Sequence, residues 1–600
     1  MSFTMVIVSR RVFPLIVVGV LGIAACGGGG DDAEPATSSP TTTVATTDEA
    51  PATTEVPATT EPAASTTTAT PTTTEAPPPP GPIIRQRLVV TGPEEIVWDW
   101  TTDRCEDAHI PDIAARAFRN ADGELNLTIS HWDSYPMVGT TFDDLATDCT
   151  RRQLTSDYDP DPAAFNDSEW IGSVFTEDGQ TVYAIVHNEY RGDTHGIAGQ
   201  CPSGQRLPCL DTSFTLAVST DGGRTFDHAA PPPNHLIATL PYTYRDDTVP
   251  SGIRQPSNVV DGGDGFYYLF GNVSDQPAEE QWVCAMRTPD LADPAAWRYW
   301  TGTDFTGVWK NPYVDEVTST DKCAPYALGA LTGSVQETIV FDEALDRWVM
   351  VGVAFDAFGV GPNWGFYYAT SADLIEWTTR EFLLEVPVTP SVADDGNDVY
   401  YAYPSLIDPD SESLSFGTSD GELYLYLTRF NAGGNSLDRD LVRWPVAVEE
   451  YEVEVPEWTF DDESDLDESA GGWTARFDVE PLTVADGALQ FTTTGDDPHF
   501  QSGAIVVPSE FDVLTIRMRL PEGLTSFGEL FWVTDLDGEL DGDKYEDFNV
   551  DGTGEFEDIR IDLSTNPEWT GTIRSIRIDP VVSGTDVVGQ IDRIWFERSS

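Results

Sequence analysis

Residues 169–189, EWIGSVFTEDGQTVYAIVHNE, consist of two stretches rich in aromatic and β-branched side chains on either side of Asp178-Gly179. Such side chains favour extended strands, and an Asp-Gly pair between two strand-like stretches is a strong signal for a tight hairpin turn. The segment therefore predicts an antiparallel β-hairpin.

Four further segments share this plan of strand, acidic or glycine turn, and aromatic-rich strand. They are 115–131, turning at Asp122-Gly123; 257–273, turning at Asp264-Gly265; 337–356, turning near Leu345-Asp346; and 413–430, turning at Asp420-Gly421. Recurring hairpins with almost no helix-period stretches are typical of propeller blades. We therefore predict an all-β protein with a five-bladed β-propeller over 85–452. Five blades are favoured over six, because a sixth would have to come from 86–100 or 225–250.

The pattern changes after Val455. The stretches 458–473, 511–520 and 591–597 alternate apolar and polar residues without the blade plan, which predicts a jelly-roll β-sandwich over 456–600. This part resembles the carbohydrate-binding modules attached to secreted carbohydrate enzymes. The resemblance implies sugar binding, and the candidate side chains are Trp532, Trp569 and Arg577, with core packing as the alternative for the two tryptophans.

The N-terminus has the order of an export signal. Arg10 and Arg11 precede the apolar run Val12–Leu21, and Ile23-Ala24-Ala25-Cys26 follows it. These last four residues resemble the lipobox of bacterial lipoproteins, which implies removal of 1–25 and lipidation of Cys26. An uncleaved membrane helix is the alternative, but the run is short for a span. We expect an exported protein, lipid-anchored on the extracellular face of the cell membrane.

The segment that follows the lipobox, 26–84, consists almost entirely of Thr, Pro, Ala, Ser and Glu after a run of four glycines. It has too few large apolar side chains to offset the entropy lost on folding. We expect a disordered stalk without secondary structure.

Seven cysteines occur, so six remain if Cys26 is lipidated. An exported protein enters an oxidising compartment, where disulfides form. Proximity along the chain favours Cys105–Cys149, Cys201–Cys209 and Cys284–Cys323, although six cysteines allow 15 connectivities.

The chain is strongly acidic, with a net charge of −70. A surface of this charge repels nucleic acid and anionic lipid, so we expect no nucleic-acid partner and membrane contact only through the lipid anchor. We expect a monomer.

Two turn motifs carry a family resemblance. Ser219, Asp221, Gly223, Thr225 and Phe226 resemble the Asp-box of sialidase-like propellers, and Asp221 is expected to bond its own turn. The segment containing Ser371, Asp373, Leu374 and Trp377 is similar to one in arabinanase-type and fructosidase-type five-bladed glycosidases. This implies a glycoside hydrolase that acts on an extracellular glycan. A non-catalytic glycan-binding or scaffold lipoprotein is the alternative, and His109 in place of an opening arginine disfavours a sialidase.

Blade topology predicts which polar residues meet at the funnel, since first strands begin and second strands end at the same face. Hydrolysis needs one protonated and one ionised carboxyl group. The resemblance to arabinanase-type enzymes implies that Asp112 is the base, because it opens blade 1 as the corresponding carboxylate does in them. Glu169 is the expected acid or pKa-tuning residue, with Glu189 competing, and His187 is expected to orient a carboxylate or act as an acid. The expected substrate-binding residues are His109, Arg116, His131, Arg254, Gln255, Glu337, Asp356, Tyr403 and Arg429. The chemistry requires no cofactor and no metal, although the resemblance allows a calcium ion (Ca2+) in the funnel.

Overall fold

The computed structural model describes residues 82–599 except 247–249, 276–277, 279, 327–333, 356–363, 389–397, 432, 434, 536–537, 539, 541 and 583. Residues 1–81, with the predicted signal peptide, Cys26 and nearly all of the predicted stalk, lie outside the described residues. The helices of the described part are all short: α1 (Trp100–Asp103), η1 (Leu207–Cys209), η2 (Pro294–Ala296), η3 (Glu463–Leu466) and η4 (Glu468–Ala470). None of them is long and apolar enough to pass through a bilayer.

The strands of the described residues up to 452 divide into five blades, as the hairpin repeat predicts, and blades 2 and 3 are joined in one 11-stranded sheet. Blades 1 and 2 contain β3 (Arg116–Arg119), β4 (Leu125–Ile129), β5 (Asp133–Gly139), β6 (Ala146–Thr147) and β7 (Leu154–Thr155), then β8 (Ser168–Phe175), β9 (Val182–Arg191), β10 (Leu210–Ser219), β11 (Asp227–His228) and β12 (Leu236–Ala238). Blade 3 contains β13 (Ser251–Arg254), β14 (Val260–Asp261), β15 (Tyr267–Asp275), β16 (Glu280–Thr288), β17 (Arg298–Tyr299) and β18 (Gly307–Val308). Blades 4 and 5 contain β19 (Ser334–Asp342), β20 (Arg347–Phe355), β21 (Trp364–Ser371) and β22 (Glu381–Leu384), then β23 (Val399–Ile407), β24 (Thr418–Ser419), β25 (Glu422–Asn431) and β26 (Arg439–Glu452).

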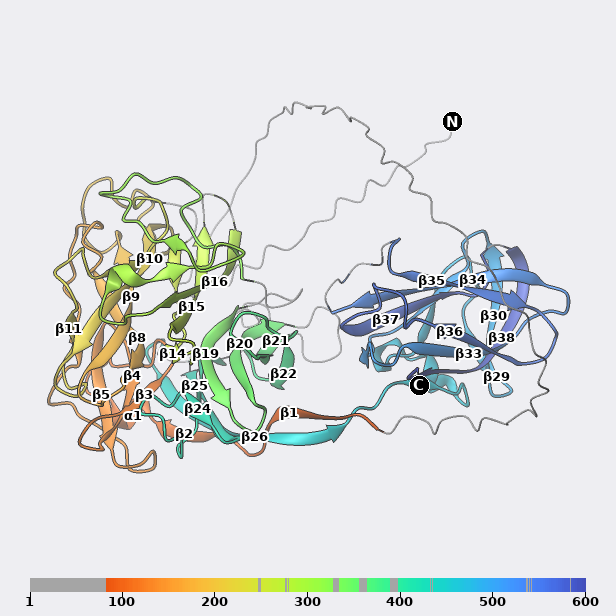
Figure 1. Ribbon diagram of the computed structural model, residues 1–600, viewed down its shortest axis with the longest axis horizontal. Coiled ribbons are helices and arrows are strands. Elements are labelled where there is room, and N and C mark those ends of the chain that lie inside the picture. The colour runs from red at the N-terminus through yellow and green to blue at the C-terminus, as the bar shows by residue number, and fades with distance from the viewer. Residues whose placement is uncertain are drawn as a thin grey trace, which may run out of the picture. The chain divides into compact units, whose positions relative to one another are not determined.

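The ring is closed by the first strand of the described chain. β1 (Ile84–Val90) pairs antiparallel with β26 from Ile84 opposite Glu452 to Val90 opposite Val446, and Figure 1 shows the two side by side. β2 (Glu95–Trp98) also pairs with β26. Residues 84–98 therefore complete blade 5 and do not form a sixth blade. Such closure covers a sheet edge that would otherwise remain exposed.

The Asp-Gly signals mark true turns. Gly123 joins β3 to β4 with φ of +80°, a conformation that side chains with a Cβ rarely adopt. In blade 4, Asp346 takes the same role with φ of +51°. Asp221 accepts hydrogen bonds from the backbone N–H groups of Arg224 and Thr225, so its carboxylate stabilises its own turn after β10.

Blade 5 differs from its predicted hairpin over 413–430. Its innermost strand is β23, further upstream, and the short β24 pairs in parallel with β19 of blade 4. The hydroxyls of Ser411 and Ser413 accept hydrogen bonds from nearby backbone N–H groups, which favours a loop over a strand.

The C-terminal part is a sandwich of two sheets around one core. One sheet contains β27 (Glu457–Trp458), β29 (Thr483–Ala485), β30 (Ala488–Gly495), β33 (Val513–Arg519), β36 (Glu557–Asp562) and β38 (Gly584–Glu597); the other contains β28 (Trp473–Phe477), β31 (His499–Ser502), β32 (Val507–Pro508), β34 (Thr525–Thr534), β35 (Tyr545–Asp551) and β37 (Thr572–Asp579). Trp532 and Trp569 belong to the buried core, with their indole N–H groups bonded to backbone carbonyls. Arg577 is ion-paired with Asp579 and Asp497. The two tryptophans therefore pack the core, which was the alternative to sugar binding.

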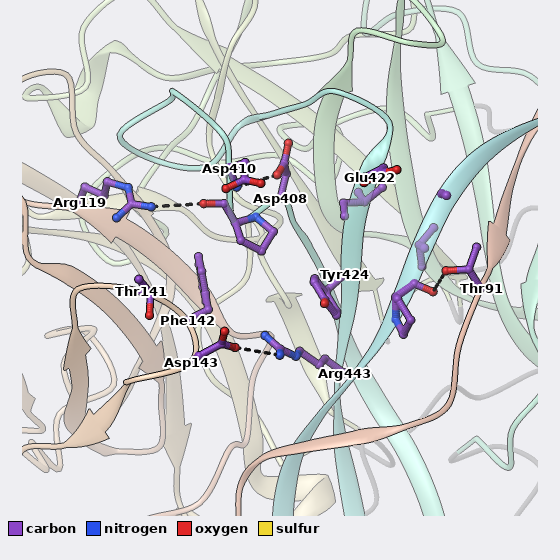
Figure 2. Close-up of a pocket in the computed structure, with 15 residues that line it drawn as sticks. Thr91, Arg119, Thr141, Phe142, Asp143, Asp408, Asp410, Glu422, Tyr424 and Arg443 are labelled. Carbon is purple, nitrogen blue, oxygen red and sulfur yellow. Dashed lines mark hydrogen bonds and ion pairs between the residues drawn. The ribbon is translucent and has the colours of Figure 1, made fainter.

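A groove of about 700 Å³ lies between blades 1 and 5 (Figure 2). Arg119, at the end of β3, lies on one side of it, and Arg443 lies on the other, paired with Asp143. Because Asp112 precedes β3 and Arg119 ends it, the groove lies toward the opposite end of that strand from Asp112. The groove is therefore separate from the predicted catalytic face.

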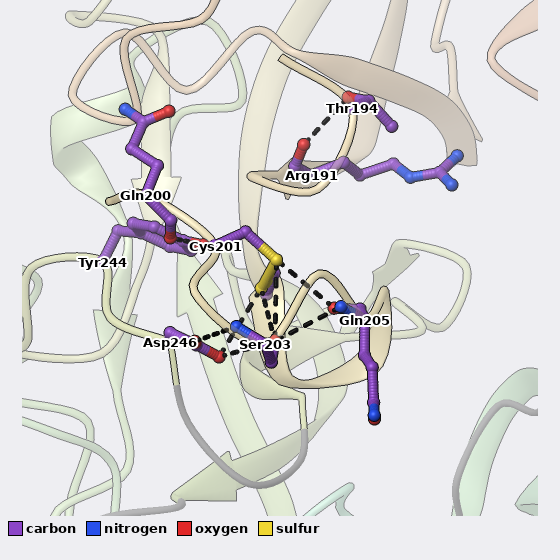
Figure 3. The surroundings of a disulfide bond; sticks show 9 residues. Arg191, Thr194, Gln200, Cys201, Ser203, Gln205, Tyr244 and Asp246 are labelled. Carbon is purple, nitrogen blue, oxygen red and sulfur yellow. Dashed lines mark hydrogen bonds between the residues drawn. A yellow bond between two sulfur atoms is a disulfide. The ribbon is translucent and has the colours of Figure 1, made fainter. Parts of the chain in front are cut away.

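All three predicted disulfides are present: Cys105–Cys149, Cys201–Cys209 and Cys284–Cys323. Figure 3 shows the second of them, where Ser203 lies beside the bond and donates through its backbone N–H and its hydroxyl to Asp246. Pairing by nearest neighbours was sufficient because each bridge joins cysteines of one blade or its loops.

The bridges should contribute unequally to stability. Cys105–Cys149 spans 44 residues and Cys201–Cys209 spans 8, so loop entropy predicts losses of about 4 and about 2.5 kcal/mol in the two Cys→Ala double variants. Denaturant unfolding of each variant beside the parent protein measures the difference. Equal losses would show that loop length does not govern their contribution.

Candidate functional site

The side chain of Arg116 in β3 contacts segments of the other four blades. Its Nε donates to Gly172 O at 2.9 Å, its Nη2 to Pro256 O at 3.1 Å and to Glu337 O, and its Nη1 to Ser405 Oγ at 3.2 Å. These four partners come from blades 2, 3, 4 and 5. One guanidinium from blade 1 therefore links the innermost segments of all the other blades.

This placement corrects the prediction that Arg116 binds substrate. The residue is 3% exposed, and the partners of its guanidinium belong to the protein. Burial lowers its pKa to about 9, against the opposing effect of Glu337. Arg116 forms the floor of the funnel, and the groups above it form the candidate site.

Asp112 lies above this floor, in the segment that leads into β3. Its Oδ1 forms an ion pair with Arg439 Nη1 and accepts a hydrogen bond from the Tyr403 hydroxyl at 3.4 Å. Its Oδ2 lies 3.6 Å from His131 Nε2. The ion pair orients the Asp112 side chain, 15% of which remains exposed. Asp112 is thus an oriented carboxylate that solvent can reach.

Tyr403 is at the centre of the charged groups. Burial raises its pKa well above the ordinary value, as does the charge of Asp112, whereas Arg439 lowers it and Glu337 and Glu189 raise it further. The phenol therefore keeps its proton and donates to Asp112. Arg439, Glu337 and Glu189 therefore act electrostatically on the same phenol that donates to Asp112.

The backbone at this site is strained. Tyr403 has φ of +59° and Gln255 has φ of +52°, both in the left-handed region. Side chains of this size rarely occupy that region, and such residues cluster at functional sites. Gln255 directly follows β13, so two innermost segments carry strain at the predicted face.

Glu337 lies in β19, the innermost strand of blade 4. Burial raises the pKa of its carboxyl to about 8, although Arg116 acts in the opposite direction. It is 5% exposed. A carboxyl group that keeps its proton at neutral pH is suited to donate it. From the sequence, Glu337 was expected only to bind substrate.

Glu189 has the opposite character. Its Oε1 lies 3.3 Å from His187 Nε2, and its Oε2 lies 3.3 Å from Arg206 Nη2. Burial alone would raise the pKa of Glu189, but the hydrogen bond from His187 and the charges of His187 and Arg206 outweigh it and lower the pKa to about 2. Glu189 therefore stays ionised, which does not suit the acid role for which it competed. His187 is the histidine that contacts this carboxylate.

Glu169 belongs to a different cluster. It is fully buried, and its Oε1 lies 2.8 Å from His228 Nε2. Burial raises its pKa, and the charged groups that act on it are His228 and Asp157. None of these is a neighbour of Tyr403. Among the described contacts, the Glu169 carboxylate therefore bonds to His228 and not to the groups that hold Asp112.

The remaining predicted residues divide into core and rim positions. His109 is fully buried between Trp98 and Tyr135, with ring centroids 5.0 Å from each, and burial lowers its pKa to about 4. It is a core residue and not a substrate ligand. His131 is also buried and has a pKa lowered to about 4 by burial, so it faces Asp112 as a neutral ring.

Two arginines and one aspartate complete the predicted set. Arg254 is buried beside Glu189 and Tyr403, and burial lowers its pKa to about 10. Arg429 is ion-paired with Glu94 and Asp440, at 2.7 Å from the latter. Asp356 lies outside the described residues.

Sequence reasoning missed Arg439, the cation that holds Asp112. It begins β26, the third strand of blade 5. Third strands begin at the same face at which first strands begin, so the topological rule could have found this residue. The predicted site residues came only from the starts of first strands and the ends of second strands.

No protein-family model matches the chain, and no curated protein matches it in sequence. Solved structures are similar to it. One is a glycoside hydrolase family 43 arabinoxylan arabinofuranohydrolase from Bacillus subtilis, in complex with cellotetraose (10% identity, TM-score 0.34, 84% of this chain and 99% of that chain covered). Another is an exo-beta-1,3-galactanase from Phanerochaete chrysosporium (9% identity, TM-score 0.30, 85% of this chain and 100% of that chain covered). A third is a sucrose-6-phosphate hydrolase from Lactobacillus gasseri (12% identity, TM-score 0.30, 82% of this chain and 93% of that chain covered).

Proposed function

We propose that this chain is a glycoside hydrolase whose acid is Glu337 and whose second carboxylate is Asp112. The observation that carries the proposal is the contrast between these two groups around Tyr403: Asp112 is paired with a guanidinium, whereas burial keeps the proton on Glu337. Two carboxyl groups in different protonation states at one site are the requirement of glycosidic bond cleavage.

In the proposed reaction Glu337 donates its proton to the glycosidic oxygen as the bond to the anomeric carbon breaks. Asp112 either removes a proton from the attacking water or attacks the anomeric carbon itself, and the anomer of the product distinguishes the two routes. Tyr403 and Arg439 orient Asp112. Glu189 remains negative and favours the positive charge that develops on the sugar ring.

We further propose that the protein acts outside the cell on an extracellular glycan and is anchored through Cys26. The lipobox-like residues 23–26 and the disulfide-bonded propeller both suit an exported protein. The 26–84 stalk would separate the propeller from the membrane.

The function is tested by a screen of the purified protein against aryl glycosides and plant, fungal and bacterial polysaccharides. Release of reducing sugar from at least one substrate is expected. Binding to glycans without turnover of any of them would favour the alternative, a non-catalytic glycan-binding lipoprotein.

The anchor has its own test. Cys26→Ala should move the protein from the membrane fraction to the medium or the soluble fraction, since a diacylglycerol anchor requires the thiol. Metabolic labelling with a fatty acid measures the modification directly. An unchanged membrane fraction would contradict anchoring through Cys26.

A further inference from the structure

We propose that Glu169, His228 and His235 form a binding site for a zinc-like divalent transition-metal ion in blade 2, apart from the Asp112 site. Glu169 lies in β8, His228 ends β11 and His235 directly precedes β12. One nitrogen of each ring and one carboxylate oxygen all lie within 4.8 Å of one another. The two rings are adjacent, with centroids 4.4 Å apart.

The hydrogen bond of His235 determines which of its nitrogens is available. Its Nε2 lies 3.1 Å from the carbonyl oxygen of Phe165. A carbonyl can only accept a hydrogen bond, so Nε2 carries the proton and Nδ1 presents a lone pair. That Nδ1 is buried and has no hydrogen-bond partner among the described residues. In a metal-binding histidine, one ring nitrogen usually donates a hydrogen bond to a carbonyl or carboxylate, and the other nitrogen is left unprotonated for the metal.

Glu169 offers a second unsatisfied group. The residue is fully buried, and its Oε2 has no hydrogen-bond partner in the described part of the chain. Leaving a buried carboxylate oxygen without a partner is costly. A cation between this carboxylate and the two imidazoles would satisfy Oε2 and His235 Nδ1 together. Glu169 Oε2 and His235 Nδ1 are two buried atoms of one cluster, and neither has a hydrogen-bond partner among the described residues. Each of them independently favours a bound ligand.

The donor set selects the class of metal. Two imidazoles and one carboxylate suit Zn²⁺ and its neighbours, which accept three protein ligands and a water molecule. Ca²⁺ and Mg²⁺ prefer shells made mostly of oxygen. The ion would link β8 to β11 and to the loop before β12, and so would stabilise blade 2.

The test uses the full-length protein stripped with a chelator and then titrated with ZnCl₂. One equivalent of zinc should bind at this cluster and raise the Tm by about 5 °C. His235→Ala and Glu169→Gln should each lose this equivalent. The control is His499→Ala, because His499 lies with Asp497 and Asp579 in the other described cluster of possible ligands, in the sandwich. That variant should keep the zinc bound in blade 2.

A second measurement does not depend on the variants folding. Co²⁺ added to the stripped wild-type protein should give visible absorption bands of low-symmetry four- or five-coordination, and X-ray absorption of the zinc form should show two imidazole ligands. The proposal is overturned if no equivalent of zinc binds, if His235→Ala and Glu169→Gln fold and bind zinc as wild type does, or if the bound metal has no imidazole ligand.

Discussion

Asp112→Asn is expected to lower kcat by about 10³-fold on every substrate that the protein hydrolyses. Asparagine has nearly the same shape and still accepts a hydrogen bond from Tyr403. It cannot hold the negative charge that takes up a proton or attacks carbon. The loss should not depend on the leaving group, because the second carboxylate is needed whatever group departs. Steady-state kinetics of the variant and the wild type on aryl and natural glycosides measures this loss of kcat.

The matched control for this variant is Asp133→Asn. Asp133 is also in blade 1, its side chain is 13% exposed against 15% for Asp112, and it too is ion-paired with one arginine, Arg152 at 2.9 Å. The Asp133→Asn variant should lose a comparable ion pair and keep its hydrolytic activity. If both variants lose activity equally with equal loss of Tm, the effect of Asp112→Asn comes from folding and the proposed role is wrong.

Glu337→Gln is expected to act selectively. An acid is needed most where the departing alcohol is a poor leaving group, so hydrolysis of natural linkages should fall by about 10²- to 10⁴-fold. Aryl glycosides with acidic phenols depart without a proton and should lose much less. The ratio of the two kcat/KM values separates this role from a general loss of structure.

The pH dependence gives a second readout for Glu337. Its pKa of about 8 predicts that activity falls as pH rises through 8, because the acid then loses its proton. Since the folded pKa lies above the unfolded value, the stability that this group contributes is fully present below pH 4.5 and is lost progressively up to about 8. The amide introduced by Glu337→Gln has no proton to lose in this range, so the variant should show a flatter stability profile. Denaturant unfolding across that pH range measures the difference.

Asp342→Asn is the control for Glu337→Gln. Asp342 lies in the same strand, is also fully buried, and burial also raises its pKa. Its Oδ1 accepts a hydrogen bond from the Leu345 N–H in the hairpin turn, at the far end of β19 from Glu337. This variant should change stability but not the ratio of natural to aryl substrates. A change in that ratio would contradict the assignment of Glu337.

The amino-acid sequence alone determined the blades, the turns and the disulfides, because each depends on local chemistry. Asp-Gly pairs specify their turns through glycine's freedom at positive φ, as at Gly123, and the bridged cysteines are close along the chain. The place of Asp112 just before an innermost strand could be predicted from the same local pattern, and its catalytic role stays a proposal.

Only the tertiary structure decided the partners of these residues. Arg439 meets Asp112 from the far end of the propeller sequence, and Arg116 meets four other blades, through contacts that no local pattern encodes. The same holds for Glu169 and His228, which are 59 residues apart. Whether a buried carboxyl group keeps its proton, as Glu337 does, depends on desolvation and on the sum of surrounding charges. Both are properties of the folded molecule, because burial and charge separation exist only after distant strands have come together.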